Sequence, residues 1–381
     1  MSIKIFRDYN KFKVCLHLTL VVSLLHNNSK SRYYGSRLEI HGSLKTSASC
    51  MSPSTPIPQS TFDALRQVHP SVCKKYSGCG LVVPEKLQGC KVLDLGSGSG
   101  RDCFILSKLV GQSGHVIGID MTAELILASR KYVQYHQEKY GYEKPNTIFV
   151  QGYIEKLNET GIQSGSLDVL VSNCAMCLCP DKKPVLREAF RVLKEGGELY
   201  FSDIYSSKAV PEHLKQDPVL WGEGLSGALY WRDLISLVHA VGFSTPYLLT
   251  ASHIIVHNSE LQKKASGITH TSATYRLFKL PKNRKQSDAV VAYKGTVPDH
   301  PDLLKFDMYH CFETDIEVTV DAEMAAVLQH SRFSSDFSIQ SSDKPAPSPK
   351  CTPQVNPLVY FLWAIQKPSC ICIFFHHTYR P

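Results

Sequence analysis

Lys-Val-Leu-Asp-Leu-Gly-Ser-Gly-Ser-Gly, residues 91–100, is the stretch of the sequence that decides the fold. Its apolar run at 92–95 ends abruptly in glycines, which is typical of a buried strand in a parallel sheet. Gly96, Gly98 and Gly100 allow a tight turn and a close approach to a ligand, because no Cβ blocks it. Helical spacing follows over 101–110. The stretch therefore predicts a strand, a glycine loop and a helix, the arrangement that binds nucleotide-like ligands in open α/β sheets.

Two further features select among such ligands. Arg101 stands where a dinucleotide fingerprint requires a third glycine, so that pattern fails. A strand with Asp94 followed by Gly-x-Gly-x-Gly resembles the S-adenosylmethionine (SAM) loop of Rossmann-like methyltransferases. SAM offers an ammonium group that a carboxylate can pair, and Asp120, twenty residues after Gly100, is placed to accept the ribose hydroxyls. The alternative is an ordinary glycine-rich turn, but the two features together favour SAM.

The composition limits the number of domains and the class of partner. The chain has 381 residues, 43% of them hydrophobic and 20% charged, which is enough for a large core and two domains. Its net charge is +8, but residues 1–50 carry eight Lys/Arg and two Asp/Glu, so six of those charges lie at the N-terminus. The remainder is nearly neutral and has no basic stripe. We therefore expect no nucleic-acid partner.

An apolar run at 14–25 follows four basic residues and resembles a signal peptide. It is too short to span a bilayer, and no small-x-small cleavage site follows it. A working signal peptide remains the alternative. We expect residues 1–32 to be an atypical extension that stays attached, with no membrane partner.

Thirteen cysteines are present, an odd number that does not suit a disulfide framework in a chain this long. Reduced thiols in the cytoplasm are the natural interpretation. Cys174, Cys177 and Cys179 are close in sequence, but zinc would need a second pair at ligand spacing, and none is evident. We expect a cytoplasmic monomer.

Along the chain, strand patterns alternate with helical ones, which predicts a doubly wound, mostly parallel sheet of the α/β class. After the opening stretch we expect strands at 115–120, 147–150, 167–171, 198–202 and 271–278, with helices at 61–75, 123–140 and 184–193. Residues 203–250, with glycines between Trp221 and Trp231, suggest a lid or substrate wall rather than a strand. Residues 33–280 then form the methyltransferase domain, 289–337 a small C-terminal α+β unit, and 338–381 a disordered or atypical tail.

The thiols suggest the methyl acceptor. Methylation of oxygen or nitrogen usually needs a base, and no His or carboxylate accompanies a motif here. Cys174 instead ends the fourth strand beside the methyl donor, and Cys79 lies in the turn before the first strand. Trivalent arsenic is a soft centre that selects thiolates, and its lone pair can attack the SAM methyl with no proton to remove. Alternatively, each cysteine is a small buried hydrophobe.

At this point the chain resembles the animal arsenite methyltransferases over residues 33–337, about four-fifths of its length. The segments that carry the resemblance are 76–85, 92–103, 118–122, 152–155, 171–174, 197–203 and 228–231. The resemblance implies a Rossmann-like class I fold. It also implies methyl transfer from SAM to arsenite or methylarsonite held as thiol conjugates, with glutathione or thioredoxin as reductant.

Matched residue by residue, the resemblance assigns two sets of positions. Cys50, Cys79 and Cys174 occupy catalytic cysteine positions, and Cys79 and Cys174 are implied to bind the arsenic(III) substrate. The resemblance also implies that the family's cysteines cycle through disulfides that thioredoxin reduces. The residues that match the SAM pocket are Asp94, Gly96, Gly98, Gly100, Asp120, Met121, Ile154, Glu155 and Asn173.

The chain departs from the family at an important place. Gly224 stands where the family motif Trp-Gly-Glu-Cys has an arsenic-binding cysteine, and Ser77 replaces a tyrosine. Two thiolates can still hold a monomethylated arsenical, but arsenite should bind more weakly. Cys177, in place of a family asparagine, or Cys179 could substitute, although we favour packing roles for both. The alternatives are a SAM-dependent methyltransferase of another small molecule and a non-catalytic paralogue that only binds arsenicals.

Overall fold

The computed structural model describes residues 57–76, 78–265, 267–285, 287–342, 346 and 356–358. Cys50, Ser77, the expected extension at 1–32 and most of the expected tail lie outside these residues.

The centre of the molecule is an eight-stranded sheet with the order β3-β2-β1-β4-β5-β8-β7 and β6 paired to β5. The strands are β1 (Lys91–Leu95), β2 (His115–Asp120), β3 (Thr147–Gln151), β4 (Leu167–Asn173), β5 (Leu193–Ser206), β6 (Leu229–Tyr230), β7 (Tyr247–His253) and β8 (His270–Phe278). All the pairings are parallel except those of β8 with β5 and β7. The predicted doubly wound, mostly parallel sheet is confirmed. The strand order reverses between β1 and β4, where ligands bind in such sheets.

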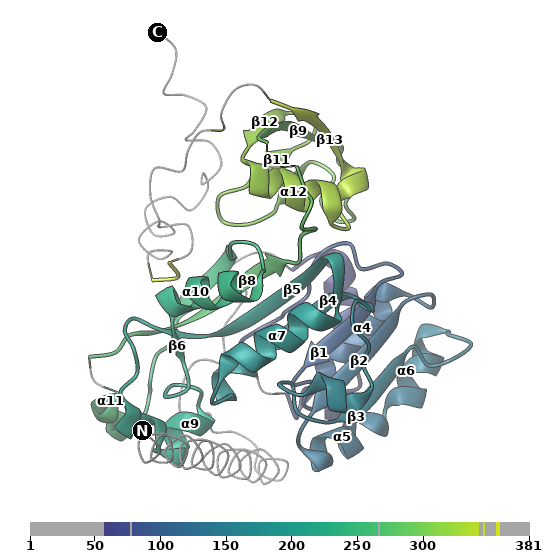
Figure 1. The fold of residues 1–381 in the computed structure, drawn as a ribbon. Coiled ribbons are helices and arrows are strands. Elements are labelled where there is room, and N and C mark those ends of the chain that lie inside the picture. The colour runs from purple at the N-terminus through teal and green to yellow at the C-terminus, as the bar shows by residue number, and fades with distance from the viewer. Residues whose placement is uncertain are drawn as a thin grey trace, which may run out of the picture.

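Helices cover both faces of this sheet (Figure 1). The α-helices of this part of the chain are α2 (Gln59–Gln67), α3 (Pro70–Cys73), α4 (Arg101–Val110), α5 (Ala123–Arg130), α6 (Val133–Tyr140), α7 (Lys182–Val192), α8 (Glu212–Lys215), α9 (Pro218–Gly222), α10 (Trp231–Val241) and α11 (Ser259–Lys264). Of these, α9 and α11 lie at one end of the domain (Figure 1). One core packs α7 and α10 on the sheet, and a second packs α2, α4 and α5 on its other face. No helix among the described residues is both long enough and apolar enough to cross a membrane.

Two predicted helices are divided in the structure. The helix expected at 61–75 breaks before Pro70, which occupies the first turn of α3, where its missing N–H has no helical partner to lose. The helix expected at 123–140 is interrupted at Tyr132, whose backbone leaves the helical region (φ −105°, ψ 4°). Strand β5 is longer than the predicted 198–202, because the chain stays buried from Gly196 to Ser206.

The segment expected to be a wall without strands is mostly regular structure. It holds the helices α8, α9 and α10 and the short strand β6 (Leu229–Tyr230), and the end of β5 and the beginning of β7 also fall within 203–250. Irregular turns connect these elements.

A small unit follows the large sheet and lies above it in Figure 1. It contains the sheet β12-β9-β13, the hairpin β10-β11 and helix α12. Their bounds are β9 (Ala289–Tyr293), β10 (Leu303–Lys305), β11 (Cys311–Glu313), β12 (Glu317–Val320), α12 (Ala322–His330) and β13 (Phe337–Ser341). Strand β13 continues past residue 337, since Phe337 and Ile339 alternate toward the unit's core. Ordered structure therefore extends beyond the expected boundary.

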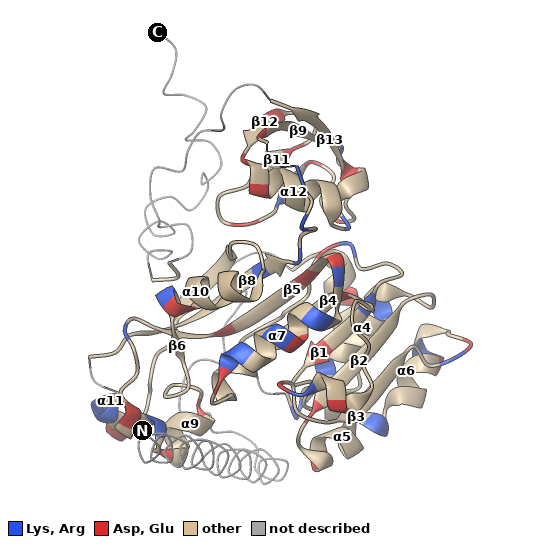
Figure 2. Ribbon diagram, viewed as in Figure 1, with Lys and Arg blue, Asp and Glu red and all other residues tan. Residues whose placement is uncertain are grey.

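A buried charge network joins the two units. The Arg276 guanidinium donates to the Glu198 and Glu85 carboxylates and to the Phe306 carbonyl, at 2.5, 3.1 and 2.9 Å. Arg332 of the small unit also pairs with Glu198. Elsewhere Lys/Arg and Asp/Glu are mixed over the described elements (Figure 2).

Candidate functional site

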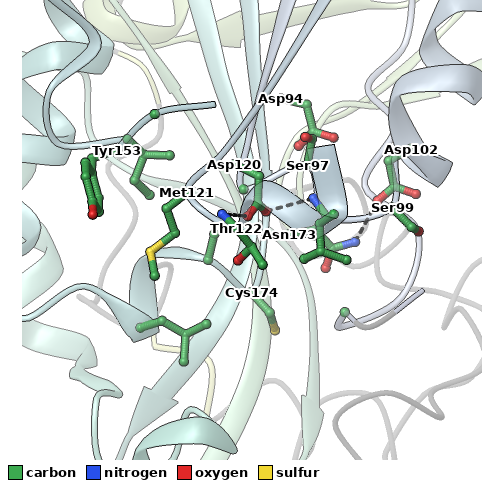
Figure 3. Close-up of a pocket in the computed structure, with 18 of the residues that line it drawn as sticks. Asp94, Ser97, Ser99, Asp102, Asp120, Met121, Thr122, Tyr153, Asn173 and Cys174 are labelled. Carbon is green, nitrogen blue, oxygen red and sulfur yellow. Dashed lines mark hydrogen bonds between the residues drawn. The ribbon is translucent and has the colours of Figure 1, made fainter. Parts of the chain in front are cut away.

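A pocket lies where β1, β2 and β4 end, beside the reversal of strand order. It is lined by the loop after β1, the turn after β2, the segment 152–155 after β3 and the residues after β4. Figure 3 shows Asp94, Asp120 and Asn173 projecting around it from three neighbouring strands. The predicted cofactor residues that line it are Asp94, Gly96, Gly98, Asp120, Met121, Ile154, Glu155 and Asn173.

The glycines of the loop have different uses. Gly98 has φ +53°, and a Cβ there would meet no atom within 4 Å, so its missing side chain leaves the pocket open. Gly100, with φ +86°, does not line the pocket, and a Cβ there would lie 2.7 Å from Phe149 Cζ. Gly100 therefore allows close packing at the start of α4.

Asp120 holds the loop in place through its buried carboxylate. Its two oxygens accept from the backbone N–H groups of Gly98, at 2.9 Å, and Thr122, at 2.8 Å. Burial raises the pKa of Asp120 above its ordinary value. Because a carboxylate has about four lone-pair sites, each oxygen can accept a further hydrogen bond from a ligand.

Asp94 is a buried carboxyl group on β1. Burial, and then the charge of Asp102, raises the pKa of Asp94 to about 8, while the Cys103 thiol donates to it at 3.2 Å. Such a group ionises readily only when a cation lies beside it. Asp94 is therefore suited to a positively charged ligand.

Asn173 connects the pocket to the loop that carries Cys79. Its amide oxygen accepts from the Cys79 backbone N–H at 2.8 Å, and its amide nitrogen donates to Tyr76 Oη, Asp102 and the Gly80 carbonyl at 2.8, 2.9 and 3.1 Å. Arg101 reinforces this arrangement from the other side. Its guanidinium lies 3.2 Å from the centre of the Tyr76 ring and donates to the Gly80 carbonyl at 2.9 Å.

Cys79 and Cys174 form a disulfide with their Cα atoms 5.9 Å apart. The expectation of reduced thiols is therefore wrong for this pair, although Cys73, Cys90, Cys103, Cys177 and Cys179 are free thiols. Cys174 lines the pocket, has a left-handed φ of +54°, and donates its N–H to the Ser202 carbonyl. Cys79 lies on the wall of a second cavity. The disulfide thus stands between the two.

Gly224 follows α9 and adopts φ +77°. A Cβ there would lie 2.8 Å from Ile204 Cδ1 and 3.0 Å from Cys177 Sγ. The thiol of Cys177 therefore fills the space beside Gly224. Among the described residues, no group of three or more His, Cys, Asp or Glu side chains is arranged to hold a metal ion.

Sequence reasoning missed several residues at the pocket. Ser97 lines it, and its buried Oγ has no hydrogen-bond partner among the described residues. Tyr76, Asp102 and Thr122 also line it. The position of Asp102 at the first turn of the helix after the glycine loop was a usable signal, but nothing local marks Tyr76.

These features fit SAM. Asp94 can pair its ammonium group, Ser97 Oγ needs a partner, and Gly98 leaves room. The same pocket has an apolar side formed by Met121, Leu125 and Ile154.

Comparisons with known proteins agree with this geometry. Residues 86–242 match the family model described as "Methyltransferase domain", and residues 286–361 match the "Arsenite methyltransferase C-terminal domain". The chain is 48% identical over 318 residues to the arsenite methyltransferase of Mus musculus, covering 84% of each protein. It is 45% identical over 315 residues to that of Aquipseudomonas alcaligenes, covering 82% of this chain and 90% of that protein.

A solved structure is also similar. It is the crystal structure of an arsenic(III) S-adenosylmethionine methyltransferase from Chlamydomonas reinhardtii, 39% identical, with a TM-score of 0.72 and coverage of 75% of this chain and 97% of that one. The resemblance inferred from the sequence motifs is confirmed: the chain belongs to the arsenite methyltransferase family.

Proposed function

We propose that this protein transfers the methyl group of SAM to trivalent arsenic, with arsenite or methylarsonite bound as thiol conjugates. The observation that carries the proposal is the meeting of Cys174, after β4, with Cys79, before β1, at the edge of a pocket suited to SAM. The names of the similar proteins support the same reaction.

The donor site uses residues from several strand ends. Asp94 pairs the ammonium group of SAM, and Asp120 accepts the ribose hydroxyls through its remaining lone pairs. Gly96 and Gly98 let the backbone approach, while Met121 and Ile154 cover the adenine ring. Glu155 and Asn173 complete the wall, and Gly100 supports the loop from behind. When bound, SAM supplies an electrophilic methyl group on a sulfonium.

The acceptor site uses thiols. Once reduced, Cys79 and Cys174 hold arsenic(III), a soft centre that thiolates select. The arsenic lone pair attacks the methyl carbon, so no general base is required. The disulfide must first open, and two thiols of glutathione or thioredoxin supply the two electrons by exchange. Cys50 takes part in that exchange. With Gly224 in place of a cysteine, arsenite has one expected ligand fewer than the family provides.

The remaining features of the proposal concern the protein as a whole. We place the methyltransferase domain at 33–280 and the small C-terminal unit from residue 289 through the expected boundary at 337 to the end of β13 at Ser341. The mixture of Lys/Arg and Asp/Glu along the described elements favours small-molecule arsenicals over nucleic acid as partners (Figure 2). The protein then works as a cytoplasmic monomer with access to cellular thiol reductants.

A methyl-transfer assay tests the proposal. The protein is incubated with labelled SAM, arsenite or methylarsonite, and glutathione with thioredoxin, and labelled arsenicals are measured. We expect labelled arsenic with the wild type, its loss in Cys174→Ser, and its retention in Cys90→Ser, which alters a free cysteine that does not line the pocket. Absence of label on either arsenical, with SAM binding demonstrated separately, would contradict the proposal. Label on a non-thiophilic acceptor would favour another substrate.

A further inference from the structure

A free thiol, Cys177, lies near the Cys79–Cys174 disulfide and has no role in the reaction proposed above. Cys177 is 2% exposed and packs in an apolar cluster with Ile204, Leu220 and Leu225. Cys79 and Cys174 pack against that same cluster. All three cysteines therefore contact the same apolar cluster, although in the disulfide form they are not arranged as a ligand set.

We propose that Cys177 is the third thiol ligand of arsenite in this protein, in the space that a side chain at position 224 would otherwise occupy. The inference rests on the proposed function and specifies its acceptor site. Arsenite has three exchangeable hydroxyl groups, and Cys79 and Cys174 replace only two of them.

The local geometry supports this role. Cys177 Sγ lies 3.0 Å from the position of a Cβ on Gly224, and the Cys177 thiol donates to the Cys174 carbonyl at 3.5 Å. The backbone N–H of Cys177 donates to the Asp203 carboxylate at 2.9 Å. Cys174 and Cys177 are three residues apart, so a span of at most about 10 Å separates their Cα atoms. The short 3₁₀ turn η3 (Met176–Leu178) lies at this connection, and such turns adjust readily.

The other free cysteines near the pocket are placed differently. Cys179 lines the donor pocket near Cys174 but packs in the core formed with α7 and α10. Cys103 lies in the core on the opposite face of the sheet, where its thiol donates to Asp94. Neither belongs to the cluster that holds Cys79 and Cys174. Cys177 is therefore the better candidate.

The chemistry suits an apolar environment. Two thiols of the reductant open the Cys79–Cys174 disulfide and become a disulfide themselves. Arsenite, As(OH)₃, then condenses with three cysteine thiols, forming three As–S bonds and releasing three water molecules. The product carries no net charge, so its burial among Ile204, Leu220 and Leu225 has no ionic desolvation penalty. The thiols can enter the reaction as neutral groups.

Counting the sulfur ligands of bound arsenic tests the inference. Reduced protein, freed of small thiols, is loaded with arsenite and studied by X-ray absorption, alongside arsenite and methylarsonite affinities. We expect three sulfurs in the wild type and in Cys179→Ala, but two in Cys177→Ala and Cys177→Ser. Because the third ligand acts at a high effective concentration, arsenite should bind about tenfold or more weakly in both Cys177 variants. Methylarsonite, with two exchangeable positions, should change less than about threefold.

A relocated thiol provides a positive control. In Cys177→Ala/Gly224→Cys the contact with Cys177 Sγ is removed, although the one with Ile204 Cδ1 stays, and a thiol returns, so three sulfurs are expected again. SAM binding by each variant reports a folded protein.

Several outcomes would overturn the inference. They are two sulfurs in the wild type, three in the Cys177 variants, or loss of a sulfur in Cys179→Ala instead. The proposed function fails separately, if Cys174→Ala still binds both arsenicals as the wild type does.

Discussion

At the scale of single residues, the site depends on groups held in states that they would not adopt alone. Asp94 is a carboxyl group whose pKa burial raises to about 8, and Cys174 has a left-handed backbone. Gly224 is left-handed too, with neighbours where a side chain would begin. Each of these residues leads to a measurable consequence.

The protonation of Asp94 should make SAM binding depend on pH. Because the pKa of Asp94 is about 8, its carboxyl group is mostly protonated between pH 6 and 7.5 in the absence of SAM. When SAM binds, its ammonium group lowers the pKa of Asp94, and the carboxyl group releases its proton. We expect affinity to rise with pH in this window, by up to about tenfold per unit, with release of about one proton per SAM. Calorimetry in two buffers of different ionisation enthalpy measures the proton.

Two substitutions provide the controls for this pH dependence. Asp94→Asn should bind SAM weakly and release no proton. Asp168→Asn, which alters a partly exposed carboxylate paired with Lys194, should behave as the wild type. Equal proton release by Asp94→Asn and the wild type would contradict the assignment.

Restoring a side chain at position 224 should destabilise the protein. Gly224→Ala combines backbone strain with contacts of 2.8 and 3.0 Å to Ile204 and Cys177. Gly161→Ala is a matched control, since Gly161 has φ +79° and no atom within 4 Å of its Cβ position. We expect about 1 kcal/mol for Gly161→Ala and about 2–4 kcal/mol for Gly224→Ala in urea unfolding. If both variants lost the same free energy of unfolding, the contacts with Ile204 and Cys177 would have no energetic effect.

At the scale of elements, the end of β4 organises both halves of the reaction. Asn173 and Cys174 are consecutive, and the first holds the Cys79 loop by hydrogen bonds while the second is bonded to Cys79 itself. The loop therefore approaches the pocket in one arrangement. The amide of Asn173 positions the thiols in addition to lining the donor pocket.

Removing that amide should weaken thiol pairing. In Asn173→Ala we expect the effective concentration of Cys79 toward Cys174 to fall by roughly tenfold, because the loop is less constrained. Equilibration with a glutathione redox buffer measures it. Asn146→Ala removes a more deeply buried amide, bonded to the Ser107 and Gly111 carbonyls, and should leave the value unchanged. A similar fall in both variants would indicate general loosening.

At the scale of the whole molecule, the small C-terminal unit contacts the segment that follows the Cys79 loop. Arg332 donates to the Glu85 carbonyl at 2.9 Å, and Lys86 pairs with Asp336 at 2.5 Å. Glu85 and Lys86 follow the Cys79 loop in sequence. Burial opposes ionisation of Glu198, but Arg276 and Arg332 outweigh it and lower the pKa of Glu198. This stabilisation is present above the unfolded pKa of a glutamate and is lost as the pH falls through the lower folded value.

Breaking this network should destabilise the protein strongly. Arg276→Met leaves the buried Glu198 with a single arginine, and we expect a loss of about 3–5 kcal/mol in urea unfolding. Lys194→Ala, which breaks the partly exposed pair with Asp168, should change stability by less than about 1 kcal/mol. If Arg276→Met also lowered the free energy of unfolding by less than about 1 kcal/mol, the network would contribute little to stability.

Local patterns predicted much of the fold. The apolar run and glycines at 91–100 act within one turn of chain, and alternation at 271–278 placed β8. The break at Pro70 was also readable, although we expected one helix there. The pairing of Cys79 with Cys174 could not be predicted from local sequence, since the two cysteines are 95 residues apart and their meeting depends on strand order. The contacts of Asn173 and the neighbours of Gly224 likewise exist only after folding.

The Cys79–Cys174 bond has a practical consequence for anyone who handles this protein. It closes a covalent ring with a sequence separation of 95 residues, which restricts the unfolded chain and adds about 4–5 kcal/mol of stability on the loop-entropy account. The same bond withholds both sulfurs from the substrate. Material purified in air should therefore melt at a higher temperature and turn over more slowly than freshly reduced material. Ranking preparations by melting temperature would select the resting form.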